Sequence, residues 1–196
     1  MDTIKLFFCD VETTGVDPKG NGITQIAGEV GYLSEEYKVM QTFNFNISPF
    51  PDDVIDPTAL EVQKKTLNDV MGYPEPRSVF RQVHDIACGF VDRYDKKDKL
   101  FFVAYNSPFD NQFLREFWGK CGDKYFGSLF WTPDICVMRL AANHLMRQRD
   151  TLPNFKLETV AGLMGVSASG DFHDANTDIQ ITRDIYLKLI NQREGK

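Results

Sequence analysis

The chain has 196 residues, and its 42% hydrophobic and 13% aromatic content suffices for a buried core, which excludes wholesale disorder. The 22 basic and 28 acidic residues give a net charge of −6, which argues against a broad basic surface but allows a local grip on a nucleic-acid end. No apolar run approaches the ~18 residues of a membrane span, and the start lacks the features of a signal peptide, so we expect a cytoplasmic protein with no membrane partner.

The four cysteines, Cys9, Cys88, Cys121 and Cys136, include no C-x-x-C pair. Structural zinc ligands are usually paired at such short spacing, so the sequence does not predict a zinc site of that kind. We expect small, buried and reduced cysteines, as in proteins of a reducing cytoplasm.

The amino-terminal part of the chain predicts three strands. Lys5–Thr13 is rich in aromatic and branched residues, and 22–33 and 39–47 alternate well enough to be its antiparallel partners. Proline and aspartate content then predicts a loop over 48–57.

Two helices and a fourth strand are expected after this loop. One short helix is predicted within 58–69, and a second, capped by Ser78, carries apolar residues at spacings of three or four as far as Tyr94. Residues 100–106 (LFFVAYN) are too short and too apolar for anything but a strand that is buried on both faces.

The remaining segments are predicted to be helices, over 107–120, 134–146, 156–164 and 174–191. Ser107 and Pro108 would begin the first of them, and Gly122 would stop it. Three antiparallel strands, followed by a strand between helices, favour an α/β fold with one mixed sheet flanked by helices. We expect a single domain over residues 1–196.

Two carboxylates end the first predicted strand. Asp10 and Glu12 are two residues apart, so they point to the same side of the strand, just before the turn that contains Gly15. Side by side they repel each other unless a cation lies between them. An acidic strand end is ordinary, but the flanking residues LFFCDV bury this strand, and burial makes unpaired acids costly.

A third carboxylate, Asp110, falls in the first turn of the helix predicted from Ser107. The S-x-x-D pattern from Ser107 to Asp110 is typical of a helix cap, and the helix dipole favours an acid at this place. These residues by themselves leave both capping and catalysis open for Asp110.

His173 and Asp178 lie at the start of the final predicted helix. Asp174 would cap this helix, which places Asp178 about one turn inside it and His173 on the preceding loop. The acids around His173 would raise its pKa toward neutrality or above. The other histidines, His84 and His144, lie in helical patterns without an acidic cluster beside them.

Together these segments supply four carboxylates and one histidine. Four converging acids would repel one another strongly, whereas two Mg²⁺ ions balance their charge. Two such ions about 3.5–4 Å apart suit in-line displacement at phosphorus, because one activates water and the other stabilises the leaving oxygen. We therefore expect two Mg²⁺ per site, with Mn²⁺ able to substitute.

Three motifs, in order and at sensible spacing, resemble those of the DEDDh 3′–5′ exonucleases: D-x-E-T-T-G from Asp10, N-x-x-F-D-x-x-F-L from Asn106 and H-x-x-x-x-D from His173. This family includes the proofreading subunit of bacterial DNA polymerase III, and ribonuclease T and oligoribonuclease are relatives. The resemblance covers almost the whole chain and implies a ribonuclease H-like fold. One departure is Tyr105, where many relatives carry histidine, and it puts substrate detail in doubt rather than the chemistry.

The resemblance assigns the metal ions to four carboxylates, Asp10, Glu12, Asp110 and Asp178. His173 would be the general base that takes a proton from the attacking water. Thr13 would help to hold the 3′ end of the terminal nucleotide, and Asn106 would contact phosphate or support the site.

Further residues bear on the nucleic acid that enters the site. Phe109 and Phe113 would stack on or wedge the terminal bases, although aromatic residues at this spacing also suit the core. Four basic residues would lie along an incoming single strand or form a solvated helix face: Arg139, Arg147, Arg149 and Lys156.

The sequence thus predicts a metal-dependent 3′–5′ exonuclease that releases nucleoside 5′-monophosphates from single-stranded 3′ ends, with DNA favoured over RNA. One alternative is a 3′–5′ exoribonuclease, since sugar discrimination depends on contacts to the 2′-hydroxyl. Another is a non-catalytic module of the same fold that binds nucleic acid or a polymerase. A DNA polymerase is a further candidate partner, although only Arg193–Lys196 follow the final helix, which favours a free-standing nuclease.

Overall fold

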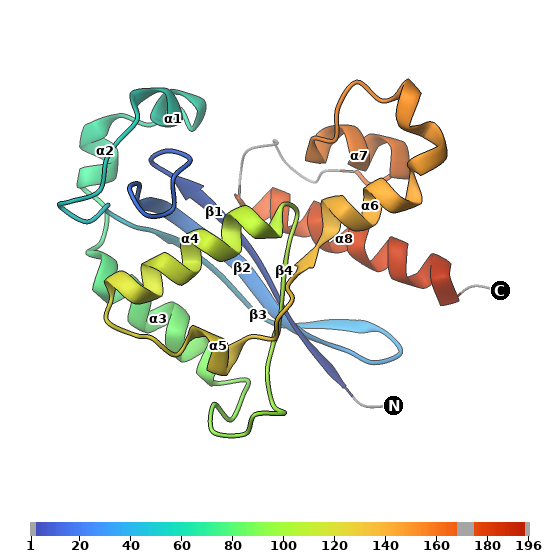
Figure 1. Cartoon of the computed structure of the whole chain (residues 1–196), viewed down its shortest axis with the longest axis horizontal. Coiled ribbons are helices and arrows are strands. Elements are labelled where there is room, and N and C mark those ends of the chain that lie inside the picture. The colour runs from blue at the N-terminus through green and yellow to red at the C-terminus, as the bar shows by residue number, and fades with distance from the viewer. Residues whose placement is uncertain (1–2, 168–174, 195–196) are drawn as a thin grey trace.

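The computed structural model describes residues 3–167 and 175–194. Its strands are β1 (Ile4–Thr13), β2 (Ile23–Leu33), β3 (Tyr37–Asn46), β4 (Phe101–Ala104) and β5 (Ile135–Cys136). They form one sheet in the order β3-β2-β1-β4-β5, which runs through the centre of the molecule (Figure 1). β1 pairs with β2 and β2 with β3 in antiparallel fashion, whereas β1 with β4 and β4 with β5 are parallel. The mixed sheet predicted from the sequence is thereby confirmed.

The helices are α1 (Pro57–Val62), α2 (Leu67–Met71), α3 (Pro76–Cys88), α4 (Ser107–Lys120), α5 (Phe126–Leu129), α6 (Val137–His144), α7 (Leu157–Met164) and α8 (Ala175–Glu194). A 3₁₀ segment, Met146–Thr151, follows α6. Within the described residues, none of these helices has both the length and the apolar character needed to cross a bilayer.

Three predicted helices differ from the observed ones. The helix expected within 58–69 is divided into α1 and α2, because Lys64 takes a positive φ of 56° and Thr66 begins a new helix with a capping box. α3 is capped by Glu75 rather than Ser78, and it ends at Cys88, so that Tyr94 is 90% exposed. The helix expected from residue 134 is preceded by the short strand β5.

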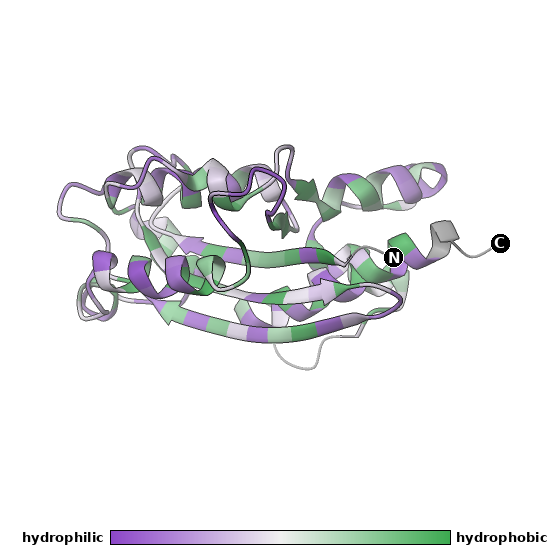
Figure 2. Cartoon of the chain, turned by 90° about the horizontal axis from the view of Figure 1, so that it is seen from below, coloured by the Kyte–Doolittle hydropathy of each residue, from purple (hydrophilic) through white to green (hydrophobic). Residues whose placement is uncertain are grey.

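Alternate residues of β1 pack into two separate cores, one on each face of the sheet. Phe7, Cys9 and Val11 contribute to the core under α3 and α4, whereas Leu6 and Phe8 contribute to the core under α6, α7 and α8. Figure 1 shows the green-to-yellow helices α3–α5 gathered on one side and the orange-to-red helices α6–α8 on the other. In Figure 2 the strands carry alternating hydrophobic and hydrophilic residues and lie between helices.

An ion pair fixes the long carboxyl-terminal helix α8 to the sheet. Arg183 Nη1 of α8 lies 3.0 Å from Oε2 of Glu29, a buried residue of β2. Apolar residues of the same helix, among them Ile181 and Ile185, are buried in the core beneath it. The start of α8, which carries Asp178, is thus held over the same face of β1 as Leu6 and Phe8.

Candidate active site

The first two carboxylates lie where β1 passes beyond its parallel neighbour. Pairing between β1 and β4 covers Leu6 to Phe8, whereas pairing with β2 continues to Glu12, opposite Gln25. Asp10 and Glu12 therefore lie on a part of β1 that is paired with β2 but no longer with β4. By strand alternation they continue the face of Leu6 and Phe8, the face that α8 covers.

The Asp110 carboxylate, in the first turn of α4, contacts β1. The residue is 4% exposed, and its Oδ1 accepts a hydrogen bond of 3.2 Å from the Val11 N–H. Asn106 is the N-cap residue of α4 and makes no side-chain cap, and within the described residues Ser107 Oγ has no hydrogen-bond partner. The capping prediction for Ser107 is therefore wrong, and the buried contact to β1 favours the catalytic interpretation of Asp110.

Burial and mutual repulsion raise the pKa values of two of these acids. Burial raises the pKa of Asp10 well above its usual range, and the charges of Asp110, Glu12 and Asp178 raise it further. Burial likewise raises the pKa of Asp110 to about 7, hydrogen bonds from the backbone N–H groups of Val11 and Asp110 itself oppose this rise, and repulsion from Glu12 and Asp134 adds to it. Residues from β1, α4 and α8 thus lie within electrostatic reach of one another.

The donor set suits a hard divalent cation. Its ligand atoms are carboxylate oxygens, which Mg²⁺ and Mn²⁺ prefer, and the cost of ionising Asp10 and Asp110 is one that a cation would offset. Within residues 3–167 and 175–194, however, no three Asp, Glu, His or Cys side chains are arranged closely enough to hold one ion. The carboxylate side chains would therefore need to move closer to one another to coordinate a metal ion.

Two pockets flank the carboxylates. We call the first, of about 290 Å³, the Thr13 pocket, which also includes Glu12, Val16, Gln63 and Phe109 in its lining. Thr13 is held there at both oxygens, since its Oγ1 donates to Gly15 O at 2.6 Å and its carbonyl accepts from Gln63 Nε2 at 2.7 Å. A strand-end threonine is thus fixed beside Glu12, where the family resemblance implies a contact with the terminal nucleotide.

We call the second pocket, of about 460 Å³, the Asp178 pocket. Its lining combines Asp178 with Asn106 of the β4–α4 turn and with Lys156 at the start of α7. Apolar residues complete it, among them Phe155, whose carbonyl accepts a 2.7 Å hydrogen bond from the Tyr105 hydroxyl. Tyr105, the departure from the family pattern, therefore supports the wall of this pocket.

The two phenylalanines of the second motif have different surroundings. Phe113 is 1% exposed within the core under α3 and α4, so the prediction that it touches a nucleotide is not supported and its alternative, a core role, holds. Phe109 is half-buried and lines the Thr13 pocket. All four basic residues proposed along the strand path, Arg139, Arg147, Arg149 and Lys156, are exposed.

Some sequence-predicted residues lie outside the described part of the chain. His173 and Asp174 fall in the segment 168–174, so the structure places neither of them, whereas Asp178 lies in the first turn of α8. Conversely, the sequence did not predict a role for Gln63, whose side chain donates to the Thr13 carbonyl, or for Asp134, whose charge acts on Asp110. No local pattern marked either residue, because each acts through a contact between distant segments.

Comparison with known proteins identifies the family to which the chain belongs. The family model RNase_T, described as "Exonuclease", matches residues 7–186. DNA polymerase III subunit epsilon of Rickettsia conorii is 26% identical over 204 residues, which cover 100% of this chain and 77% of that protein. Ribonuclease T of Baumannia cicadellinicola subsp. Homalodisca coagulata is 28% identical over 109 residues, which cover 54% of this chain and 49% of that protein.

Solved structures of E. coli Exonuclease I share the fold. A complex with a dT13 oligonucleotide superimposes with a TM-score of 0.74 at 22% identity, covering 97% of this chain. A zinc-bound complex with single-stranded DNA gives a TM-score of 0.75 at 21% identity and covers 100% of this chain. In both comparisons this chain spans 42% of the length of the Exonuclease I chain.

Proposed function

We propose a mechanism and a substrate for this chain, which belongs to the exonuclease family and is a 3′–5′ exonuclease. The family model matches residues 7–186. The enzyme removes nucleoside 5′-monophosphates from the 3′ end of single-stranded DNA and uses two Mg²⁺ ions, which Mn²⁺ can replace. A single domain over residues 1–196, acting in the cytoplasm, carries this activity.

One observation carries the proposal: the buried carboxylate of Asp110 on α4 accepts the Val11 N–H at 3.2 Å, on β1 between Asp10 and Glu12. Asp10, Glu12, Asp110 and Asp178 would hold the two ions. When bound, the ions would activate the attacking water and stabilise the charge that develops on the leaving oxygen. Their positive charge would also draw the carboxylates inward from their mutually repelling positions.

The remaining residues would position the substrate and move a proton. His173 would accept the proton of the attacking water, a task for which a pKa near the working pH is suited. Thr13 would contact the terminal nucleotide from its fixed place in the Thr13 pocket, together with Phe109. Asn106 and Lys156 line the Asp178 pocket and would contact phosphate there.

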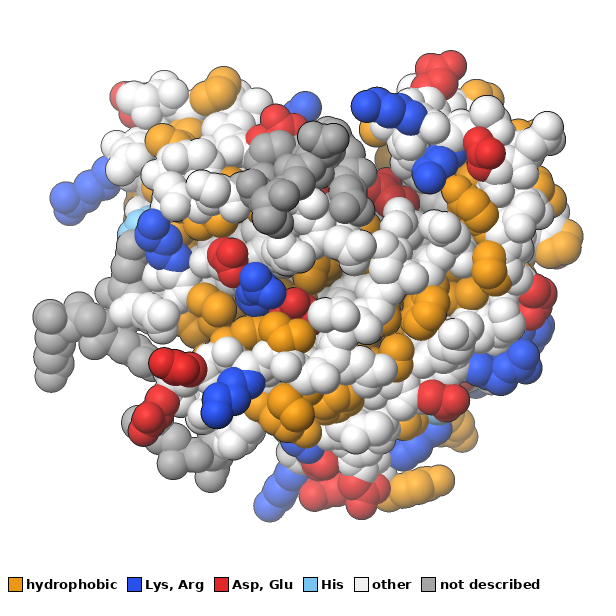
Figure 3. All heavy atoms as spheres, turned by 180° about the vertical axis from the view of Figure 1, so that it is seen from behind, with side chains coloured by type: hydrophobic (Ala, Val, Ile, Leu, Met, Phe, Trp, Pro, Cys, Tyr) orange, Lys and Arg blue, Asp and Glu red, His pale blue; other side chains and the backbone are white. Residues whose placement is uncertain are grey.

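The charge distribution on one face agrees with recognition of a strand end rather than of a long duplex. Figure 3 shows blue and red side chains interspersed over the face turned away in Figure 1, and no continuous blue track crosses its described part. The net charge of −6 agrees with this distribution. Attraction of the phosphate backbone would therefore come mainly from the metal ions and from a few basic residues near the site.

The relatives favour DNA and leave RNA as the second candidate substrate. The similarity to DNA polymerase III subunit epsilon, and to Exonuclease I bound to dT13, supports single-stranded DNA and makes a DNA polymerase a candidate partner. The similarity to ribonuclease T supports an exoribonuclease. The choice depends on how the Thr13 pocket meets the 2′-hydroxyl of the terminal sugar.

Digestion of matched oligonucleotides tests the proposal. DNA and RNA of one sequence, each labelled at the 5′ end, should yield a ladder that shortens from the 3′ end, with faster shortening of DNA. Nucleoside 5′-monophosphates should be the only small products, and chelation of divalent ions should stop the reaction. Faster shortening of RNA would favour the second candidate, and internal cuts or shortening from the 5′ end would refute the proposal.

A further inference from the structure

A network of polar contacts holds the chain just after the end of β1 that carries Asp10 and Glu12. The β1–β2 ladder is regular as far as the pair Glu12–Gln25, and its register shifts between Glu12 and Thr13. Residues 14–22 beyond this shift form a turn, which we call the β1–β2 turn. Its position depends on hydrogen bonds to the loop over residues 48–56 as well as on those within the turn.

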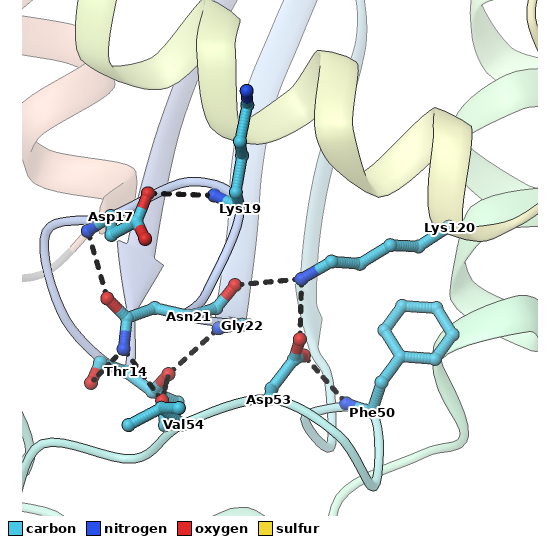
Figure 4. Close-up of polar contacts among 9 residues, drawn as sticks. All are labelled: Thr14, Asp17, Lys19, Asn21, Gly22, Phe50, Asp53, Val54 and Lys120. Atoms are coloured by element: carbon cyan, nitrogen blue, oxygen red, sulfur yellow. Dashed lines mark hydrogen bonds and ion pairs between the residues drawn. The ribbon is translucent and has the colours of Figure 1, made fainter.

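Asn21 joins the β1–β2 turn to this loop through its side-chain amide. Its Oδ1 accepts from the Asp17 N–H at 2.9 Å, and its Nδ2 donates to Val54 O at 2.7 Å, as Figure 4 shows. The Thr14 hydroxyl donates to the same Val54 carbonyl at 2.7 Å. Packing around the amide is tight, since a Cβ on Gly15 would lie 2.5 Å from Asn21 Oδ1.

Lys120, the last residue of α4, reaches this network from the other side (Figure 4). Its Nζ donates to Asn21 O at 3.0 Å and pairs with Asp53 Oδ1 at 2.5 Å. The Asp53 side chain is 3% exposed, and its second oxygen accepts from the Phe50 N–H at 2.8 Å. One ammonium group therefore fixes both the β1–β2 turn and the loop.

The turn and the loop together form one wall of the Thr13 pocket. Gly15 and Val16 come from the turn, and Asp56 comes from the end of the loop, where its N–H donates to Thr14 O at 2.7 Å. Lys120 does not line this pocket, so any effect that it has on a bound nucleotide passes through other residues.

We propose that Lys120, acting with Asp53 and Asn21, is a positioning residue that sets this wall of the Thr13 pocket and thereby the binding of the substrate's 3′ end. The inference rests on the proposed function of that pocket. The metal ligands are held differently, since Asp10 and Glu12 lie in the regular part of the ladder and Asp110 lies at the opposite end of α4. Loss of Lys120 should therefore weaken substrate binding and leave the metal requirement unchanged.

The matched variants Lys120→Met and Lys5→Met test this proposal. Lys5 is a similar lysine elsewhere: its Nζ pairs with Asp98 Oδ1 at 2.5 Å, it also donates to the Phe90 carbonyl, and its side chain has the same 25% exposure. Its partner Asp98 is 29% exposed, whereas Asp53 is 3% exposed. Both variants lose one lysine ion pair, so both should have a lower Tm. Only Lys120→Met should raise KM for a single-stranded oligonucleotide, by about tenfold, with kcat changed less than about threefold.

Two further measurements separate positioning from a general loss of structure. The Mg²⁺ concentration for half-maximal activity should be the same in Lys120→Met and wild type. Lys120→Arg should restore KM, because a guanidinium group can donate to both Asn21 O and Asp53. If Lys120→Met does not fold, Asp53→Asn, which keeps the shape of the side chain and removes its charge, should show the same rise in KM.

The proposal is overturned if KM in the folded variant, Lys120→Met or Asp53→Asn, matches that of Lys5→Met. It is also overturned if KM stays unchanged while the Mg²⁺ requirement shifts, or if neither network variant folds. Failure of the proposed function looks different, because wild type itself would then shorten no oligonucleotide from the 3′ end. In that case the affinity for a labelled oligonucleotide in Ca²⁺, measured by fluorescence anisotropy, is compared instead of KM. Equal affinities of wild type and of the folded variant, Lys120→Met or Asp53→Asn, would overturn the inference.

Discussion

Replacing Asp110 with asparagine should lower kcat at least about a thousandfold and still leave a folded protein. The loss is expected because a neutral amide is a poorer ligand for Mg²⁺ and does not balance its charge. The fold should persist, since the asparagine Oδ1 can accept the Val11 N–H hydrogen bond that Asp110 accepts at 3.2 Å. Multiple-turnover assays with saturating Mg²⁺ and labelled oligonucleotide measure the effect.

The same substitution should make the metal-free protein more stable at neutral pH. The pKa of Asp110 is raised from 3.8 to about 7, so the folded state binds this proton more tightly than the unfolded state does. The free energy of unfolding of metal-free wild type should therefore fall as pH rises from about 4 to about 7. Asparagine removes this contribution, which we expect to raise stability by about 2–4 kcal/mol at pH 7.5 and Tm by several degrees.

Thermal unfolding in chelator across this pH range measures the change, with Asp52→Asn as the control because Asp52 is exposed. The difference between Asp110→Asn and wild type should be small near pH 4 and should grow toward pH 7.5. Full activity of Asp110→Asn would show that Asp110 is not a metal ligand. A variant that is less stable than wild type at pH 7.5 would show that the ionised Asp110 carboxylate does not destabilise the metal-free fold.

The second large effect is expected for His173→Ala. Removal of a general base typically lowers a rate by ~10²–10⁴-fold, and we expect kcat to fall within this range. The four carboxylates remain, so the affinity for Mn²⁺ should change little. The pH–rate profile should change as well, because the acid limb that reports titration of the base in wild type should disappear in the variant.

His144→Ala is the matched control for this variant, since His144 is an exposed residue at the end of α6. It should keep both the rate and the pH profile of wild type. Full activity of His173→Ala across neutral pH would refute the role of general base. A parallel loss of Mn²⁺ affinity would instead assign His173 to metal binding.

The sequence predicted the elements whose pattern is local. The three antiparallel strands are confirmed with ends that differ by no more than two residues, because alternation and β-branched or aromatic content mark each of them. β5 was missed because its two residues, Ile135 and Cys136, are too few to show a period. These two residues form a strand only because they pair in parallel with Val103 and Ala104 of β4, which is a contact between distant segments.

The candidate site was predictable to the extent that side chains follow from strand and helix geometry. Strand alternation placed Asp10 and Glu12 on one face, but the sequence left Asp110 between capping and catalysis. Only the tertiary contact with Val11 favours one of the two. The network of Asn21, Asp53 and Lys120 carried no signal, since its members lie on two loops and a helix end that meet only in the folded chain.

The central claim is that Asp10, Glu12, Asp110 and Asp178 jointly hold two divalent ions. Titration with Mn²⁺, followed by electron paramagnetic resonance in the presence of a nucleoside 5′-monophosphate, counts the ions directly. We predict two bound Mn²⁺ per chain in wild type, and loss of both at the same concentrations in the double variant Asp10→Asn/Asp178→Asn. No bound Mn²⁺ in wild type, or equal binding by the double variant, would contradict the account.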